Sequence, residues 1–125
     1  DYCIELLKQN IVKPPFRLEI IGKEWGSYSE DRERKVFEID IAAINSEEKK
    51  MLFCECKWKD NVNAESILSD LKKKSELVEW NKTTRKNYYM IFAKSFKDKK
   101  AAEKNTELID LNDLQEIFNK KNKPK

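Results

Sequence analysis

Hydrophobic and polar residues alternate over two short stretches near the middle of the chain. Residues 38–44 and 51–58 have the period of two that is typical of β-strands, and the polar residues between them suit a turn. Side chains alternate faces along a strand. In the first stretch, one face is expected to carry Phe37, Ile39 and Ile41, and the other face Glu38, Asp40 and Ala42. In the second stretch, one face is expected to carry Leu52, Cys54, Cys56 and Trp58, and the other face Phe53, Glu55 and Lys57. The pattern predicts a hairpin that gathers three carboxylates and a lysine: Glu38, Asp40, Glu55 and Lys57.

The same reading of periodicity predicts the remaining elements. The expected helices cover residues 1–10, 64–80 and 97–104, with a last one that starts near Leu111. Further strands are expected at residues 16–21, 88–96 and 107–109, and a polar connecting loop at 27–35. We therefore expect one α/β domain over residues 1–119, followed by a basic disordered tail at 120–125.

Length and composition agree with a single small domain. The chain has 125 residues, of which 39% are hydrophobic and 39% charged, and no apolar run approaches a membrane span. A net charge of +3 permits nucleic-acid binding without requiring it. Three cysteines form no disulfide framework, so we expect a reducing, cytoplasmic location and no membrane partner. A chain that begins at Asp1 without Met indicates a fragment or a trimmed protein.

Several kinds of chemistry are excluded by residues that the chain lacks. Without histidine there is no Ser-His-Asp or Cys-His arrangement, and a zinc site at Cys54 and Cys56 would find only Cys3 as a further ligand. Two glycines cannot build a phosphate-binding loop, so any ATPase activity must lie elsewhere.

The acidic residues of the hairpin leave two interpretations open. Buried charges are costly unless they are paired or coordinate a metal. Three acids around one lysine raise one another's pKa, which favours a site for Mg²⁺ or Mn²⁺. A salt-bridged cluster across two strands is the alternative.

These residues also resemble a known motif. Asp40 followed by Glu55-Cys56-Lys57 is similar to the PD-(D/E)xK signature of the restriction-endonuclease-like superfamily. Glu38-Ile39-Asp40 with the run from Glu55 to Trp58 resembles, more narrowly, a domain of unknown function at the C-terminus of archaeal-type P-loop ATPases. Ile39 stands where the motif often has proline. The acidic residue that such nucleases carry on their first helix would be Glu5 or would lie upstream.

The resemblance implies a fold and a set of roles. The fold would be a mixed central sheet with an α-β-β-β-α-β core flanked by helices. Asp40 and Glu55 would bind Mg²⁺ or Mn²⁺, together with the backbone carbonyl of Cys56. Lys57 would orient the attacking water or act as catalytic base, and Glu38 would be an auxiliary acid.

We therefore expect a metal-dependent endonuclease domain that hydrolyses DNA phosphodiester bonds and belongs to a larger ATPase. The expected partners are DNA and an upstream ATPase domain of the same chain, and a homodimer is compatible with the sequence. Two alternatives stay open: a catalytically silent interaction or regulatory domain, and a domain that binds DNA without cleaving it. Basic residues cluster at 72–74, 82–86 and 97–100. Either they form a phosphate track, a surface that binds the phosphates of DNA, or they are solvated lysines.

Overall fold

One mixed five-stranded sheet runs through the chain in our computed structural model, which describes residues 2–99 and 103–121. Its strands are β1 (Ile20–Glu30), β2 (Glu33–Asn45), β3 (Lys50–Lys57), β4 (Lys86–Ala93) and β5 (Thr106–Ile109). The helices of the described ranges are α1 (Tyr2–Lys8), α2 (Ala64–Ser75) and α3 (Leu111–Lys121). The predicted order α-β-β-β-α-β followed by β and α is confirmed, without the additional helix expected at residues 97–104. No helix in these ranges has both the length and the apolar character needed to cross a bilayer.

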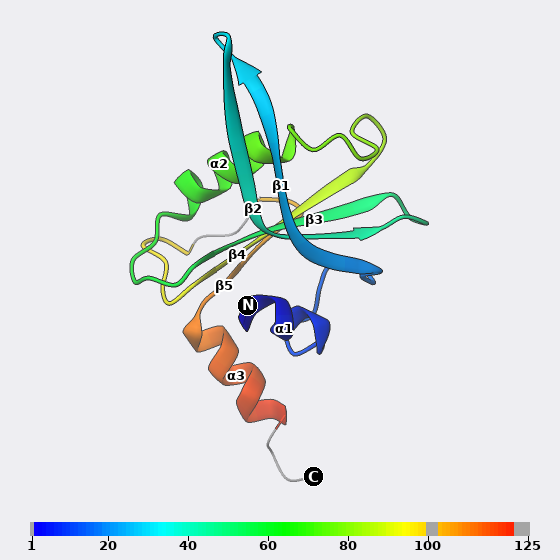
Figure 1. Cartoon of the computed structure of the whole chain (residues 1–125). Helices are drawn as coiled ribbons and strands as arrows, with labels where there is room; N and C mark the ends of the chain where they lie inside the picture. Colours follow the sequence, from blue (N-terminus) through cyan, green and yellow to red (C-terminus); the bar gives the residue numbers. More distant parts are fainter. Residues whose placement is uncertain (1, 100–102, 122–125) are drawn as a thin grey trace.

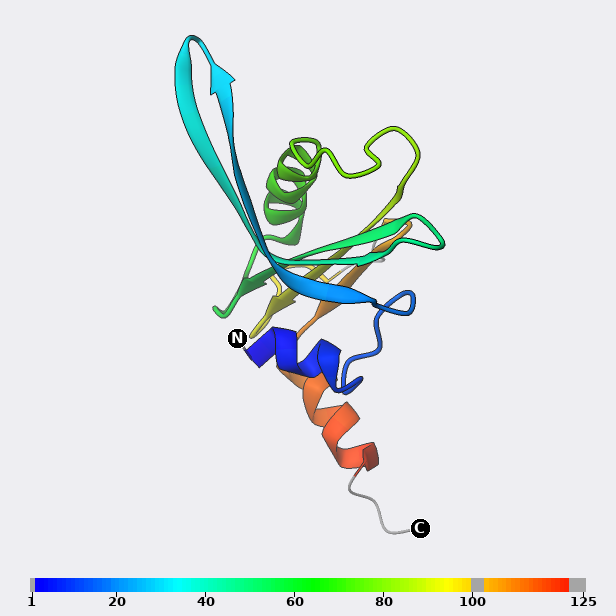
Figure 2. The same cartoon turned by 45° about the vertical axis from the view of Figure 1, so that its right-hand side comes forward.

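The strands lie in the sheet in the order of the chain. The pairs β1–β2 and β2–β3 are antiparallel, and the pairs β3–β4 and β4–β5 are parallel. A parallel pair needs a crossover, and α2 provides it between β3 and β4. α2 lies on one side of the curled sheet, whereas α1 and α3 lie on the other (Figures 1 and 2).

The two faces of the sheet carry separate hydrophobic clusters. Leu6 and Leu7 of α1 and Leu114 of α3 pack with Met90 and Phe92 on one face. On the other face Leu71 of α2 is the helical member of a cluster that includes Phe37, Ile39, Ala42, Met51, Phe53 and Val78. Burial on both faces explains the nearly continuous apolar sequence of β4, which is typical of a central strand.

A bulge in β2 changes the predicted assignment of faces. Gly22 pairs with Ala42 and Glu24 pairs with Ile39, so two β2 residues, Asp40 and Ile41, lie opposite Lys23 alone. Ile39 consequently packs on the α2 side and Ile41 on the side of α1 and α3. The prediction that these two side chains share a face is therefore wrong, because a bulge interrupts the period of two.

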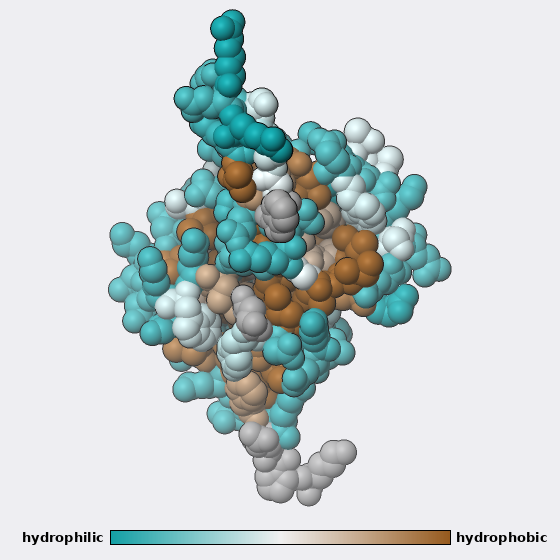
Figure 3. Space-filling model, in the orientation of Figure 1, coloured by the Kyte–Doolittle hydropathy of each residue, from teal (hydrophilic) through white to brown (hydrophobic). Residues whose placement is uncertain are grey.

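The first hairpin extends beyond the helices as a two-stranded arm, formed by residues 27–36 (Figures 1 and 2). Asp31 and Arg32 form its turn with φ of 52° and 66°, the positive values that a tight two-residue hairpin turn requires. The polar loop predicted at 27–35 is therefore wrong. Hydrophilic residues form the outer end of the arm (Figure 3), so neither face carries the apolar alternation that identifies a strand.

Other boundaries also differ from the predictions. Of the strand expected at 16–21 only Ile20 and Ile21 are in β1, and α2 ends at Ser75 instead of Trp80. Residues 97–99 and 103–104 are not helical, and the remainder of that predicted helix lies outside the described residues. α3 continues through Lys121, so residues 120 and 121 are helical; the other residues of the expected tail, 122–125, are not described.

Candidate functional site

Asp40 and Glu55 meet where β2 and β3 pair. The last registered pair of these antiparallel strands is Ile41 with Cys54, so Asp40 and Glu55 occupy the next positions along the two strands. The Asp40 carboxyl lies close enough to Glu55 to raise the pKa of Glu55. The backbone N–H of Cys56 donates to Asp40 Oδ2 at 3.0 Å, which holds that carboxylate over the end of β3. Two predicted site residues are thus in direct contact.

A third residue of this cluster, Lys74, comes from α2. Its Nζ lies 3.0 Å from Glu55 Oε1, and the Glu55 side chain is only 4% exposed. This contact was not predicted from the sequence, where residues 72–74 are three consecutive lysines. Spacing gives a usable signal, since Lys74 lies three residues after Leu71 and four before Val78, both of which are buried.

Burial dominates the electrostatics of Glu55. The pKa of Glu55 is raised to about 7; loss of hydration is the largest cause, and the neighbouring Asp40 carboxyl adds to the rise. Lys74 acts in the opposite direction through its hydrogen bond and charge, without cancelling the rise. Glu55 is therefore a carboxyl group with a raised pKa that has a second carboxyl group and one lysine beside it.

The remaining predicted site residues lie outside this hydrogen-bonded cluster. Lys57 is half-buried and has no ion-pair partner among residues 2–99 and 103–121. Glu38 is exposed on β2 and forms an ion pair with Lys23 of β1. Glu5 is exposed on α1 and accepts a hydrogen bond from Gln9, and among the described residues no hydrogen bond or ion pair joins it to Asp40 or Glu55.

The donor set of the cluster suits a hard divalent cation. Two carboxylates and a backbone carbonyl offer only oxygen ligands, and Mg²⁺ keeps several waters when it binds to so few protein groups. Within the described part of the chain, no group of three or more Cys, Asp or Glu side chains is arranged to hold an ion. An ion at Asp40 and Glu55 would consequently depend on water for much of its coordination.

Two thiols lie beside the cluster. Cys3 Sγ of α1 and Cys56 Sγ of β3 are 2.8 Å apart. Their hydrogen bond lowers the pKa of Cys56, whereas the same bond and burial raise the pKa of Cys3. The fully buried Cys54 has its pKa raised by loss of hydration.

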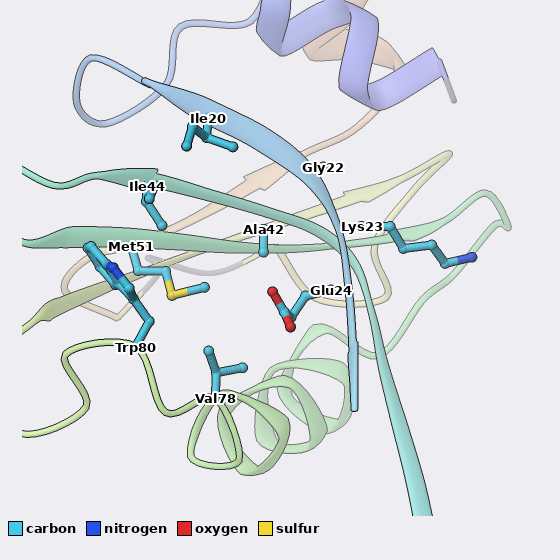
Figure 4. A pocket seen from close by; sticks show the side chains of 9 residues that line it. All are labelled: Ile20, Gly22, Lys23, Glu24, Ala42, Ile44, Met51, Val78 and Trp80. Atoms are coloured by element: carbon cyan, nitrogen blue, oxygen red, sulfur yellow. The ribbon is translucent and has the colours of Figure 1, made fainter. Parts of the chain in front are cut away.

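Two cavities border α2. One, of about 530 Å³, lies between α2 and the arm and is lined by Glu38, Lys74 and also Tyr28, Glu30, Val36, Phe37, Asp70, Lys73 and Leu77. The other, of about 230 Å³, lies beyond the end of α2, where Met51, Val78 and Trp80 form apolar walls (Figure 4). Glu24 points into this second cavity and Lys23 points away from it (Figure 4). The first cavity is the one that contains site residues.

Comparison with known proteins gives the chain a family. Residues 1–74 match the model of DUF234, described as "Archaea bacterial proteins of unknown function". The chain belongs to the DUF234 family. An uncharacterized protein of Methanocaldococcus jannaschii is 36% identical to it over 116 residues, which are 91% of this chain and 23% of the relative. This DUF234 chain thus spans about a quarter of that relative's length. No solved structure matches it.

The DUF234 match contains the whole cluster. Asp40, Glu55 and Lys57 fall within residues 1–74, and Lys74 is the last matched position. β4, β5 and α3 follow the matched region, although β4 forms the centre of the sheet with β3.

One basic residue of the expected phosphate track has a structural role in this DUF234 chain. The Arg85 guanidinium donates hydrogen bonds of 2.7 Å to the carbonyls of Ser75, Val78 and Trp80. It also donates to Asn87 Oδ1 and lies 5.4 Å from the ring centre of Phe53. These contacts cap the C-terminal end of α2. They also occupy most of the hydrogen-bond donors of Arg85, so few remain for binding a phosphate.

Proposed function

We propose that this DUF234 domain is a metal-dependent phosphodiesterase that acts on DNA and has a restriction-endonuclease-like fold. The observation that supports it most directly is that Asp40 and Glu55 lie at neighbouring positions of adjacent strands. Two ionised carboxylates beside the single cation of Lys74 leave one negative charge uncompensated, and a divalent cation would offset its cost. The residues therefore fit the group that the motif implies.

Each residue of the motif has a role in this proposal. Asp40, Glu55 and the backbone carbonyl of Cys56 would hold Mg²⁺ or Mn²⁺. When bound, that ion would supply Lewis-acid activation of water and of the phosphate. Lys57, which has no ion-pair partner in the described ranges, would orient the attacking water with its ammonium group. Lys74 would hold the Glu55 carboxylate in place by its 3.0 Å contact.

The arrangement of strands supports the same proposal. The element order agrees with the expected α-β-β-β-α-β core followed by β and α. The motif strands β2 and β3 are antiparallel and lead through α2 to a parallel β4, so the site lies where an antiparallel part of the sheet joins a parallel part.

A nicking assay tests the proposal. We expect the chain to relax supercoiled plasmid in Mg²⁺ or Mn²⁺ and to lose this activity when EDTA is added. Asp40→Asn and Lys57→Met should each lower the rate by at least about a hundredfold, since each removes a group that acts in the transition state. Asp31→Asn on the arm and Lys59→Met after β3 are matched controls that should retain activity. Nicking that survives Asp40→Asn and Lys57→Met equally would contradict the proposal.

A second function, a non-catalytic interaction module on a larger ATPase, is favoured by the arm. The arm projects from the domain (Figures 1 and 2), and Val36 on it is 72% exposed. A two-stranded arm that projects beyond the body of the domain and carries an exposed valine offers a protein partner a surface that is distinct from Asp40 and Glu55. In the plasmid assay this alternative predicts no metal-dependent nicking by any variant. In binding assays with the ATPase part of the same full-length protein, it predicts that Val36→Glu abolishes binding and that Asp40→Asn binds as the parent chain does.

A further inference from the structure

We infer that Cys3 and Cys56 form a redox modification site, at which a low-molecular-weight disulfide such as glutathione disulfide oxidises the two thiols to an intramolecular disulfide. This inference does not depend on the proposed function, because the thiol pair is present whether or not the neighbouring carboxylates bind a metal. It concerns two elements, α1 and β3, that are 53 residues apart in sequence.

The geometry brings the two sulfur atoms almost to bonding distance. Their separation is 2.8 Å, and a disulfide needs a further approach of only about 0.8 Å, which small side-chain rotations can supply. The position of Cys3 is held by its neighbours on α1, Leu6 and Leu7, which lie on the same buried face of the helix. Alternation along β3 places Cys56 on the face of the sheet that α1 covers. Formation of the disulfide thus requires no rearrangement of either element.

Exposure decides the order of the reaction. Cys3 is 1% exposed and Cys54 is completely buried, whereas Cys56 is only half-buried and is the thiol that a small reagent reaches first. The Cys56 thiolate attacks one sulfur of the small disulfide, whose S–S bond breaks and releases one thiolate. Cys3 then attacks Cys56, and the second small thiolate leaves. The two protons from Cys56 and Cys3 pass to the two released thiolates, so two cysteines are oxidised and one small disulfide is reduced.

The experiment measures thiols and connectivity in the folded 125-residue chain. The chain is incubated with glutathione disulfide, alkylated after unfolding, and analysed by mass spectrometry without reduction. We expect the number of alkylated cysteines to fall from three to one, with Cys54 the residue still labelled. Peptides containing positions 3 and 56 should be linked, no disulfide should join two chains, and dithiothreitol should reverse the change.

Variants separate this disulfide from other thiol reactions. Cys54→Ala should still form the link, whereas Cys3→Ser and Cys56→Ser should not. Closing a long loop should also raise the melting temperature of the oxidised chain by about 5 °C or more, and Cys56→Ser treated in the same way should show no rise. Retention of all three thiols, a lasting glutathione adduct, a link through Cys54 or an intermolecular link would each overturn the inference.

Discussion

Glu55 lies in the interior beside one cation and one further carboxyl group, and this environment couples its ionisation to folding. Its pKa is about 7 in the folded chain, above the ordinary value of 4.5. Between these two pH values the unfolded chain has lost a proton that the folded chain retains. The stabilising contribution of Glu55 is therefore complete below pH 4.5 and is lost as the pH rises through 7.

Glu55→Gln should remove this dependence, because a glutamine side chain does not ionise. Both chains are compared in metal-free buffer with EDTA. As the pH rises from 4.5 to 8, the free energy of unfolding of the variant should increase relative to that of the parent chain. The gain should be at most about 3 kcal/mol, as expected from the size of the pKa shift. Urea unfolding across this range measures it. Glu76→Gln, at an exposed position, controls for the loss of one negative charge, and equal pH profiles for parent and Glu55→Gln would contradict the argument.

At the scale of residues, the sequence predicted the partners that lie on adjacent strands better than those that come from elsewhere. Asp40 and Glu55 were paired correctly because a short turn and antiparallel alternation determine which residues meet. Lys74 and Cys3 were missed as neighbours of the site, since their positions depend on how α2 and α1 pack on the two faces of the sheet. The helical spacing of Lys74 from Leu71 indicated that Lys74 faces the sheet, but the run of three consecutive lysines was interpreted as one basic cluster instead.

At the scale of elements, the two glycines of β1 have different surroundings. A Cβ atom built at Gly26 would lie 2.7 Å from Cε1 and 2.9 Å from Cζ of the Phe37 ring. Phe37 is buried, so its ring has little space in which to move away. A Cβ atom at Gly22 would meet nothing within 4 Å.

Gly26→Ala should therefore destabilise the chain by about 1–3 kcal/mol, the usual cost of overpacking. Gly22→Ala, the matched control in the same strand, should change the free energy of unfolding by less than about 0.5 kcal/mol. Chemical denaturation of both variants measures the difference. A cost for Gly22→Ala as large as that for Gly26→Ala would show that backbone freedom, not the Phe37 ring, is what β1 requires.

Arg85 stabilises a second element boundary. Its three hydrogen bonds to the carbonyls of Ser75, Val78 and Trp80 need the planar fork of a guanidinium group, which lysine does not provide. Arg85→Lys should lower the free energy of unfolding by about 2–4 kcal/mol and increase hydrogen exchange in residues 76–84. Arg34→Lys on the arm, where the described residues offer the guanidinium of Arg34 no side-chain hydrogen bond but those to the exposed Ser27 hydroxyl, should cost less than about 0.5 kcal/mol. Similar costs for both changes would argue against this role of Arg85.

The helices α2 and α3 were predictable because one face of each is apolar and the other is polar, whereas β2 and β3 were predictable from short apolar runs whose two faces are both largely buried. The arm was predicted as a loop because its side chains are polar on both faces. The bulge at Asp40 was also unpredicted, since it depends on how β1 pairs with β2. α2 ended early because Arg85 and the Ser75 side chain satisfy carbonyls at its end, a long-range effect for which periodicity has no signal.

At the scale of the whole molecule, the DUF234 match and the folding unit have different extents. The matched region ends at residue 74, within α2, whereas β3 needs β4 as its parallel neighbour. Met90, Ile91 and Phe92 of β4 are completely buried, and Leu114 of α3 closes the cluster over α1. The residues that hold the site in place thus lie partly beyond the region that carries its motif.

A fragment of residues 1–80 contains every residue of the candidate site but should not fold by itself. Without β4 it would expose the edge of β3 and the apolar surfaces that Met90 and Phe92 cover, and such an edge promotes association instead of folding. We expect the fragment to show no cooperative unfolding transition by circular dichroism and poorly dispersed amide resonances by NMR. Addition of a peptide of residues 81–125 should restore a transition, because the missing strand and helix then complete both clusters. Cooperative unfolding of 1–80 alone would show that the first three strands and two helices form an independent core, and that β4, β5 and α3 only extend it.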